Sequence, residues 1–269
     1  MDADKELEQR RSWYSAAATA YNRVRPRYPV DLIQRAIELA QLPPKAKILE
    51  IGCGPGIATV EFARRGFSMV CVEPSLEMCQ FAQQSCAEYP NVEIQNTSFE
   101  EWDLQTDSFD AVLAATSFHW IRPEIACPKA ADALRDNCPL ILLWNVVPSP
   151  RYEVFQVLKE VYQNFVPSLA KYEPIEQDKL NLQAINQTVI DSGRFQKLIS
   201  DEFVYKITYN TDDYLMLLST LSPYIALEPE ARNALFAGLR AKIEQELPGA
   251  IALEHLSTFE IMQKTVEDE

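Results

Sequence analysis

Short apolar runs and longer periodic stretches alternate along the first half of the chain. A short apolar run is typical of a buried strand, and apolar positions three and four residues apart are typical of a helix. These patterns predict strands at 47–51, 67–72, 92–95, 110–115 and 140–144, and helices at 31–42, 57–65, 75–88 and 123–135. Because each right-handed crossover places its helix on a face of the sheet, the alternation predicts an α/β fold with helices on both faces of a parallel sheet.

The pattern changes after residue 145, where helical periodicity dominates. It predicts helices at 151–169, 178–191, 212–219 and 228–246, a strand at 201–209 and a last strand within 251–265. We therefore expect one domain over residues 1–269. Its predicted parts are a core at 31–147, a helical cap insertion at 148–200, and the last strands and helices at 201–269.

Three of the seven glycines, Gly52, Gly54 and Gly56, lie within five residues. They follow the strand predicted at 47–51 and precede the helix predicted at 57–65. Glycine at such a turn permits unusual backbone angles and lets the main chain approach a ligand, while the start of the helix offers backbone N–H groups. A nucleotide-like cofactor at the carboxyl ends of the strands is therefore the expected ligand.

The residues around this turn distinguish between cofactors. A phosphate-binding loop for ATP or GTP needs a lysine that is missing here, and a dinucleotide turn needs one more residue between its second and third glycines. Glu50 precedes the turn, and its carboxylate would repel a pyrophosphate but attract ammonium and sulfonium groups. Glu73 ends the second strand, where a carboxylate can accept hydrogen bonds from both hydroxyls of a ribose.

The run ILEIGCGPG at 48–56 and the run VCVEPS at 70–75 resemble the first two motifs of the class I S-adenosylmethionine-dependent methyltransferases. Further stretches are similar to a group of small-molecule methyltransferases in this family, so the resemblance covers most of the chain; these stretches are 21–29, 99–104, 117–124 and 142–145. The resemblance implies a Rossmann-like, doubly wound, mostly parallel seven-stranded sheet whose last strand is antiparallel. One departure is the turn at 136–139, where many relatives have glycine; Asn137 can adopt the left-handed conformation instead.

The resemblance also implies roles for individual residues. Those that would surround the methionyl part of S-adenosylmethionine are Glu50, Gly52, Cys53, Gly54 and Gly56. Those that would contact its nucleoside are Glu73 at the ribose, with Pro74, Ser98 and Phe99 at the adenine. Thr116 follows the fourth strand and would lie beneath the methyl donor, whose product after transfer would be S-adenosylhomocysteine.

His119 is the candidate for a general base or an orienting group, because it is the only histidine near the predicted site. A histidine that only orients or caps its neighbours is the alternative. A base is optional, since the sulfonium is already a good leaving group and the enzyme mainly aligns the reactants and excludes water. Trp120 and Trp144 are candidate acceptor-binding residues, with packing in the core as the alternative.

Residues 1–30 would form an N-terminal lid over the cofactor or, alternatively, a surface helix without a chemical role. The family resemblance favours the lid. In it, Tyr21 and Arg25 would contact the cofactor, with the guanidinium of Arg25 meeting a carboxylate of the cofactor or of an acidic substrate. Tyr14 would then contact the methyl acceptor.

Charge and composition limit the partners. A formal net charge of −14 opposes binding to nucleic acid. Because no apolar run approaches about 18 residues and the first residues are charged, we expect no membrane span or secretion signal and a cytoplasmic location. Six cysteines without a CxxC pair and only two histidines suggest neither a metal site nor a disulfide framework. The chain would be a monomer or a homodimer.

The leading interpretation is an enzyme that transfers a methyl group from S-adenosylmethionine to a small molecule whose identity the sequence leaves open. One alternative is an oxidoreductase that uses NAD(P), against which the glycine spacing and Glu50 argue. Another is a non-catalytic protein that binds S-adenosylmethionine or S-adenosylhomocysteine and reports it to a partner. The binding motifs of this last alternative would be the same.

Overall fold

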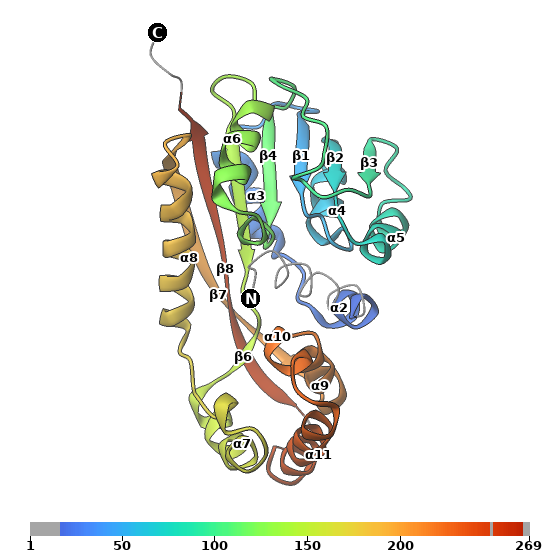
Figure 1. Cartoon of the computed structure of the whole chain (residues 1–269), viewed down its shortest axis with the longest axis vertical. Coiled ribbons are helices and arrows are strands. Elements are labelled where there is room, and N and C mark those ends of the chain that lie inside the picture. Colours follow the sequence, from blue (N-terminus) through green and yellow to red (C-terminus); the bar gives the residue numbers. More distant parts are fainter. Residues whose placement is uncertain (1–16, 248–249, 266–269) are drawn as a thin grey trace. The chain divides into compact units, whose positions relative to one another are not determined.

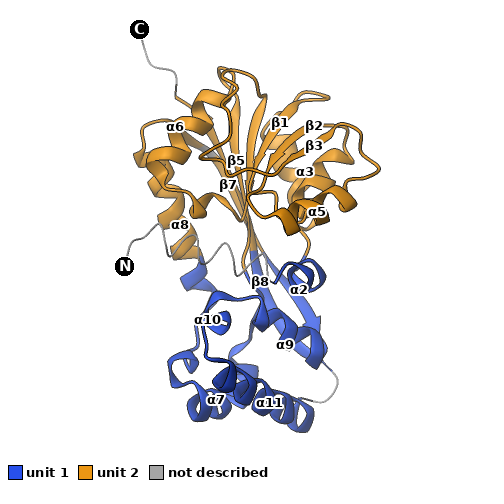
Figure 2. Cartoon of the chain, turned by 45° about the vertical axis from the view of Figure 1, so that its right-hand side comes forward, with its two compact units in different colours: residues 1–26, 147–178, 204–256 blue, residues 27–146, 179–203, 257–269 orange. Residues whose placement is uncertain are grey.

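The computed structural model describes residues 17–247 and 250–265 (Figure 1). The chain divides into two compact units (Figure 2). The sheet unit comprises residues 27–146, 179–203 and 257–269, and the helical unit comprises residues 1–26, 147–178 and 204–256. Each unit is therefore assembled from three separate segments, and β7 and β8 contribute residues to both.

The sheet unit is built on five parallel strands, which lie in the order β3-β2-β1-β4-β5 (Figure 1). Their bounds are β1 Lys47–Ile51, β2 Ser68–Val72, β3 Val92–Gln95, β4 Ala111–Ala115 and β5 Pro139–Asn145. Next to β5 lies β8 (Ile251–Lys264) in antiparallel pairing, and β7 (Phe195–Tyr209) pairs with β8. This confirms a mostly parallel sheet with an antiparallel last strand. The two-residue strand β6 (Ser149–Pro150) brings the sheet to eight strands within the described residues.

Helices cover both faces of the sheet in this unit (Figure 2). Those that cover it are α3 Val30–Leu39, α4 Ile57–Ala63, α5 Leu76–Ser85, α6 Pro123–Ala133 and α8 Ile175–Asp191. Successive residues of a strand point to opposite faces. Accordingly, Ile48 packs with residues of α3, α4 and α5, whereas Leu49 packs with residues of α6 and α8. The strands are thus buried on both sides, which is why they appear in the sequence as continuous apolar runs.

Single residues help to set the ends of these elements. The hydroxyl of Ser75 caps α5 by accepting a hydrogen bond from the amide of Met78 at 3.2 Å. Gly66, which follows α4, has a φ of +85°, and Asn137 before β5 has a φ of +60°. Asn137 therefore does adopt the left-handed conformation where many relatives have glycine.

The helical unit has its own apolar core. Its helical elements are α2 Ala18–Val24, α7 Tyr152–Phe165, the 3₁₀ turn η2 Pro167–Leu169, α9 Thr211–Ser219, α10 Ser222–Ile225 and α11 Pro229–Glu246. Leu158 of α7, Tyr214 of α9 and Leu239 of α11 are buried together in this core. The prediction that residues 1–269 form a single domain stays a prediction.

The largest errors in the predicted boundaries concern α7 and β7. The helix predicted at 151–169 ends at Phe165, because Pro167 follows and the residue before a proline disfavours the helical conformation. The strand predicted at 201–209 begins at Phe195, inside the region expected to be helical insertion, because pairing with β8 extends it. Among the described helices, none combines the length and the apolar character that a membrane span requires.

Candidate functional site

The carboxyl ends of β1, β2, β4 and β5 meet at one edge of the sheet, because these strands are parallel. The glycine turn at 52–56 follows β1, and Glu73 follows β2. Thr116 follows β4, and Trp144 lies near the end of β5. The structure therefore brings most of the residues predicted for the cofactor to the same edge, within the sheet unit.

The three glycines of the turn all have positive φ, at +66° for Gly52, +55° for Gly54 and +84° for Gly56. A Cβ at Gly52 would lie 2.7 Å from Cβ of Ser117, so close packing also requires glycine there. A Cβ at Gly54 would meet no atom within 4 Å. Gly52 therefore serves the packing of the turn, whereas Gly54 borders open space that a ligand could fill.

Glu73 is held in place by the turn that it faces. Its Oε2 accepts a hydrogen bond from the amide of Gly54 at 3.0 Å, and its Oε1 accepts one from the amide of Ser75 at 2.9 Å. The residue is 8% exposed. These two bonds orient the carboxylate at the end of β2. The neighbouring Pro74 is exposed, and its carbonyl accepts a hydrogen bond from the side chain of Asn96 at 3.0 Å.

Glu50 lies beneath the turn and is fully buried. Its Oε2 accepts hydrogen bonds from the hydroxyl of Thr59 at 2.7 Å and from the thiol of Cys71 at 3.7 Å. Its Oε1 has no hydrogen-bond partner among the described residues. Burial raises the pKa of Glu50 to about 7, so its negative charge is only partly present at neutral pH. The predicted attraction of this carboxylate for ammonium and sulfonium groups stays a prediction.

Cys53 is buried within the turn, and its thiol donates to the carbonyl of Gly54 at 3.7 Å. Its interaction with Cys71, together with burial, raises the pKa of Cys53 well above its usual range. Burial raises the pKa of Cys71 to about 11. Both thiols therefore stay protonated at neutral pH, as small packing groups and weak donors. The described residues contain no group of three or more potential ligands that could hold a metal ion.

Thr116 has a φ of +56°, which is unusual for a β-branched residue. Its hydroxyl is hydrogen-bonded to the hydroxyl of Tyr28 at 2.7 Å and accepts from the amide of Asn145 at 3.1 Å. The next residue, Ser117, donates its hydroxyl to the carbonyl of Ile51. These bonds join the ends of β1, β4 and β5. A strained backbone such as that of Thr116 is typical of functional sites.

Ser98 and Phe99 form a tight turn after β3. The hydroxyl of Ser98 accepts from the amide of Glu101 at 3.2 Å, and the ring of Phe99 is buried and stacked on Trp102, with 6.2 Å between ring centroids. The ammonium of Lys129 on α6 lies 5.4 Å from the Phe99 ring. Both side chains are thus used to fold the turn, and contact of these two residues with an adenine stays a prediction.

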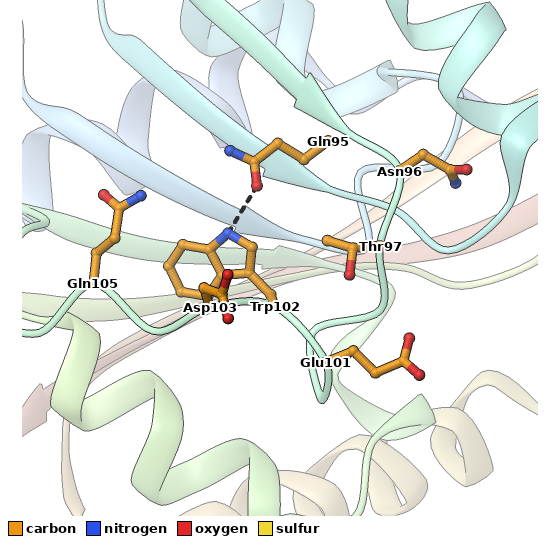
Figure 3. Close-up of a pocket in the computed structure, with 7 residues that line it drawn as sticks. All are labelled: Gln95, Asn96, Thr97, Glu101, Trp102, Asp103 and Gln105. Carbon is orange, nitrogen blue, oxygen red and sulfur yellow. Dashed lines mark hydrogen bonds between the residues drawn. The ribbon is translucent and has the colours of Figure 1, made fainter.

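A pocket of about 450 Å³ lies along the loop that follows β3 (Figure 3). It is lined by Gln95, Asn96, Thr97, Glu101, Trp102, Asp103 and Gln105. Figure 3 shows the indole of Trp102 donating to the side chain of Gln95, a hydrogen bond of 2.9 Å. No predicted site residue lines this pocket. Its signal in the sequence was only a series of polar residues after a strand, which also describes an ordinary loop.

His119 lies in the short 3₁₀ turn η1 (Phe118–Trp120) and is exposed. Its ring centroid lies 5.0 Å from that of Trp120 and 5.4 Å from that of Trp144. Trp144 is buried, at 2% exposure, and Trp120 is half-buried. The three rings predicted for the acceptor thus form one aromatic group next to Thr116, although their roles stay predictions.

Of the residues predicted for the lid, Tyr21 and Arg25 belong to the helical unit. Arg25 donates to the hydroxyl and to the carbonyl of Thr220, each at 3.1 Å, and its guanidinium lies 4.7 Å from the ring centroid of Tyr21. Arg25 is thus bound within its own unit, and contact of Tyr21 and Arg25 with a cofactor stays a prediction. Tyr14 lies outside the described residues.

Sequence reasoning did not assign site roles to Thr59, Ser117 or Asn145, and it placed Tyr28 only in the lid predicted over residues 1–30. Ser117 and Asn145 directly follow Thr116 and Trp144, so polar residues at strand ends were a usable signal. Thr59 and Tyr28 lie on or before helices whose pattern only showed an apolar face. Their partners are set by tertiary packing: Tyr28 and Thr116 are 88 residues apart in the chain.

Comparison with known proteins finds similarity to methyltransferases. The family model for a methyltransferase domain matches residues 48–137. An uncharacterised methyltransferase of Mycobacterium tuberculosis is 34% identical over 132 residues, which are 49% of this chain and 51% of that protein. The chain thus spans about half the length of the mycobacterial relatives that it matches. An uncharacterised methyltransferase of Schizosaccharomyces pombe is 28% identical and matches 81% of this chain and 82% of that protein.

Solved structures share the fold. The YcgJ protein of Bacillus subtilis aligns with a TM-score of 0.51 and 16% identity, over 88% of this chain and 99% of that one. A phosphoethanolamine N-methyltransferase of Haemonchus contortus, solved with phosphomonomethylethanolamine and S-adenosylhomocysteine, has a TM-score of 0.51 and 16% identity, over 94% of this chain and 58% of that one. The match at residues 48–137, together with the glycine turn, Glu73 and the parallel sheet described above, supports a class I S-adenosylmethionine-dependent methyltransferase.

Proposed function

We propose that this chain binds S-adenosylmethionine and transfers its methyl group to a small-molecule acceptor. The match of residues 48–137 to the model of a methyltransferase domain supports the reaction class. The chain's net charge of −14 disfavours a nucleic-acid acceptor, because long-range repulsion opposes the approach of a phosphate backbone.

The observation that carries the proposal is the fixed carboxylate of Glu73 beside the open face of Gly54. The amides of Gly54 and Ser75 orient this carboxylate at the end of β2. A carboxylate at that place suits the two hydroxyls of a ribose, which are hydrogen-bond donors. A pyrophosphate, by contrast, would be repelled by it.

The residues of the turn fit a cofactor with a short amino-acid part better than they fit a dinucleotide. A Cβ at Gly54 would enter open space, so the glycine leaves room for a bound group against the backbone. The turn from Gly52 to Gly56 also lacks the extra residue of a dinucleotide fingerprint. These features disfavour the alternative of an oxidoreductase that uses NAD(P).

Each part of the edge would have a distinct task. Glu73 would hold the ribose, the backbone at Ser98 and Phe99 would contact the adenine, and Cys53 and Gly54 would border the methionyl part. When bound, the cofactor supplies a methyl group on a positively charged sulfur. The task of this chain is then to align the acceptor in line with the methyl–sulfur bond and to exclude water.

His119 would act on the acceptor and not on the cofactor. Its exposed ring stands three residues after Thr116 and packs against Trp144. A neutral imidazole in this place could take the proton of an acceptor hydroxyl or amine as the methyl group arrives. With an acceptor that has no proton to lose, the same ring would only orient it.

The test is calorimetric titration of the purified chain with S-adenosylmethionine, S-adenosylhomocysteine and NADH. We expect the first two to bind and NADH not to bind. In the Glu73→Ala variant, the affinity for S-adenosylhomocysteine should fall by about 1 to 3 kcal/mol, because charge-assisted hydrogen bonds to the ribose are lost. Glu77→Ala is the matched control, since it removes a nearby exposed carboxylate.

Binding of NADH alone would overturn the proposal, and an unchanged affinity in Glu73→Ala would remove the ribose role of that residue. Product analysis separates the enzyme from a non-catalytic binding protein. Incubation of the chain with labelled S-adenosylmethionine and a panel of small phenols, amines and acids should yield S-adenosylhomocysteine only in the presence of an acceptor.

A further inference from the structure

Two neighbouring buried residues have polar atoms without a hydrogen-bond partner among the described residues. They are Nε1 of Trp144 on β5 and Oγ1 of Thr258 on β8. The two residues are direct partners in the antiparallel pairing of these strands. Residues that are directly opposite in such a pair point to the same face of the sheet. Trp144 is 2% exposed and Thr258 is 6% exposed, so bulk water does not satisfy either group.

These two atoms lie at the edge of the sheet where the methyl acceptor would be expected. The residue after Trp144 is Asn145, whose amide donates to the hydroxyl of Thr116 at 3.1 Å. On the other side, the exposed ring of His119 packs against the ring of Trp144, and Trp120 packs against His119. The unpartnered atoms thus adjoin an aromatic group that reaches the surface.

An unpartnered indole N–H in a buried place is costly, and native proteins rarely leave one unsatisfied. The N–H can only donate, so whatever meets it must present an acceptor atom. The hydroxyl of Thr258 can donate or accept, so it can bind the same oxygen or a hydrogen on it. Other members of the surrounding core are apolar, among them Phe118, Ile121 and Leu142.

Resting on the proposed function, we propose that Trp144 and Thr258 bind an uncharged oxygen atom of the methyl acceptor, which is a planar aromatic molecule such as a phenol. The oxygen would accept from the indole of Trp144, and the ring would stack on His119 and Trp120. An uncharged oxygen fits better than a carboxylate, because burying a charge in this apolar core without an opposite charge is costly. Flat rings adjacent to a polar contact favour an aromatic body.

The experiment uses the chain saturated with S-adenosylhomocysteine and labelled with ¹⁵N in its tryptophan side chains. The chain has four tryptophans, and the Trp144→Phe variant identifies which indole signal belongs to Trp144. The probes are phenol and toluene, which match in size and differ in the oxygen. We expect phenol to move the Trp144 indole proton downfield and toluene to leave it in place.

Affinities measured by the same titrations test the two residues. For phenol, affinity should fall about tenfold in Trp144→Phe, which removes the indole N–H, and several-fold in Thr258→Val, which replaces the hydroxyl by a methyl group of the same shape. Trp102→Phe is the matched control and should bind phenol like the wild type, because its indole already donates to Gln95 at 2.9 Å. Every variant must first bind S-adenosylhomocysteine normally, which shows that it is folded.

Three outcomes are decisive. If phenol and toluene move the Trp144 signal equally, or if neither moves it, the two atoms enclose only a water molecule and the inference is wrong. If phenol binds Trp144→Phe and Thr258→Val as tightly as the wild type, the inference is wrong for those residues. If the wild type fails to bind S-adenosylhomocysteine at all, the proposed function is wrong and this inference is wrong with it. If Trp144→Phe does not fold, the difference in wild-type affinity between phenol and toluene and the phenol affinity of Thr258→Val still test the inference.

Discussion

Glu50 is a buried carboxyl group whose partners satisfy only one of its oxygens. Its pKa is about 7 in the folded chain, raised by burial from an ordinary value of 4.5. Between these two values the folded chain holds a proton that the unfolded chain has lost. The free energy of unfolding therefore falls as the pH rises from about 4.5 to about 7. Above pH 7 this loss is complete and amounts to on the order of 3 kcal/mol.

The Glu50→Gln variant should remove this dependence, because its amide is neutral at every pH and can still accept from Thr59. We expect its free energy of unfolding, relative to wild type, to rise by about 2 to 3 kcal/mol between pH 5 and pH 8. Urea unfolding at both pH values measures this. The exposed Glu88→Gln serves as control, and an equal pH dependence in all three proteins would contradict the prediction.

The glycines of the turn should separate stability from ligand binding. At Gly52, alanine meets both a φ of +66° and Cβ of Ser117 at 2.7 Å, so Gly52→Ala should cost about 2 to 4 kcal/mol of stability. At Gly54, alanine meets open space, so Gly54→Ala should cost only about 1 to 2 kcal/mol of stability.

Gly54→Ala should nevertheless weaken S-adenosylhomocysteine binding by about tenfold or more, because the methyl group enters the space left for the ligand. Thermal unfolding and calorimetry of the two variants check this contrast. A Gly54→Ala variant that binds normally would show that the ligand does not approach this part of the turn.

Residue patterns were enough to predict the parts of the site that lie in one short segment. The glycines and Glu73 stand next to strand ends, and their chemistry is legible from residue type and spacing. Thr59 and Ser117 were not assigned, and the contact of Tyr28 with Thr116 was not predicted, because these roles depend on partners brought together by packing. The pairing of Trp144 with Thr258 depends on the register of β5 against β8, which no local pattern specifies.

At the scale of elements, proline and glycine made the boundaries predictable. The strands β1 and β3 match their predicted ranges, and the predicted helices of the sheet unit exist as helices. The errors lie where tertiary pairing extends an element, as in β7, or where a proline two residues ahead ends it, as in α7. A local pattern carries no information about strand pairing, so it could not predict the extension of β7. It does include Pro167, so the end of α7 was predictable.

The hydrogen bond between Tyr28 and Thr116 ties the segment before α3 to the end of β4, at 2.7 Å. Tyr28 is 6% exposed, so the bond is shielded from water. We expect a double-mutant cycle of Tyr28→Phe and Thr116→Val to give a coupling energy of about 1 kcal/mol. Urea unfolding measures it. The same cycle with the exposed Tyr152→Phe should be additive, and additivity in both cycles would contradict a shared bond.

For the whole molecule, the important feature is that neither compact unit is a continuous piece of chain. Each consists of three segments, and β7 and β8 run through both. A change that breaks β7 or β8 therefore affects both units. The apolar pattern of the sequence gave no signal of this division, because it reports where elements are and not which of them pack into one core.

We expect the chain to unfold in one cooperative transition. Trp102, Trp120 and Trp144 belong to the sheet unit, so tryptophan fluorescence follows mainly that unit. Far-ultraviolet circular dichroism at 222 nm follows the helices of both. Coincident urea midpoints for the two signals are the expected result. A fluorescence midpoint clearly separate from that of circular dichroism would show that the units unfold independently.

The pairing of β5 with β8 also has a consequence for the order of synthesis on the ribosome. Residues 139–145 of β5 are made well before their partners at 257–263 of β8. At about 5 to 20 residues per second, the edge of β5 stays open for on the order of ten seconds while the helical unit is translated. An open apolar edge of this kind invites pairing with another nascent chain. We therefore expect chaperones to bind the nascent chain most strongly after β5 has emerged from the ribosome. This binding should end once β8 has emerged and paired with β5.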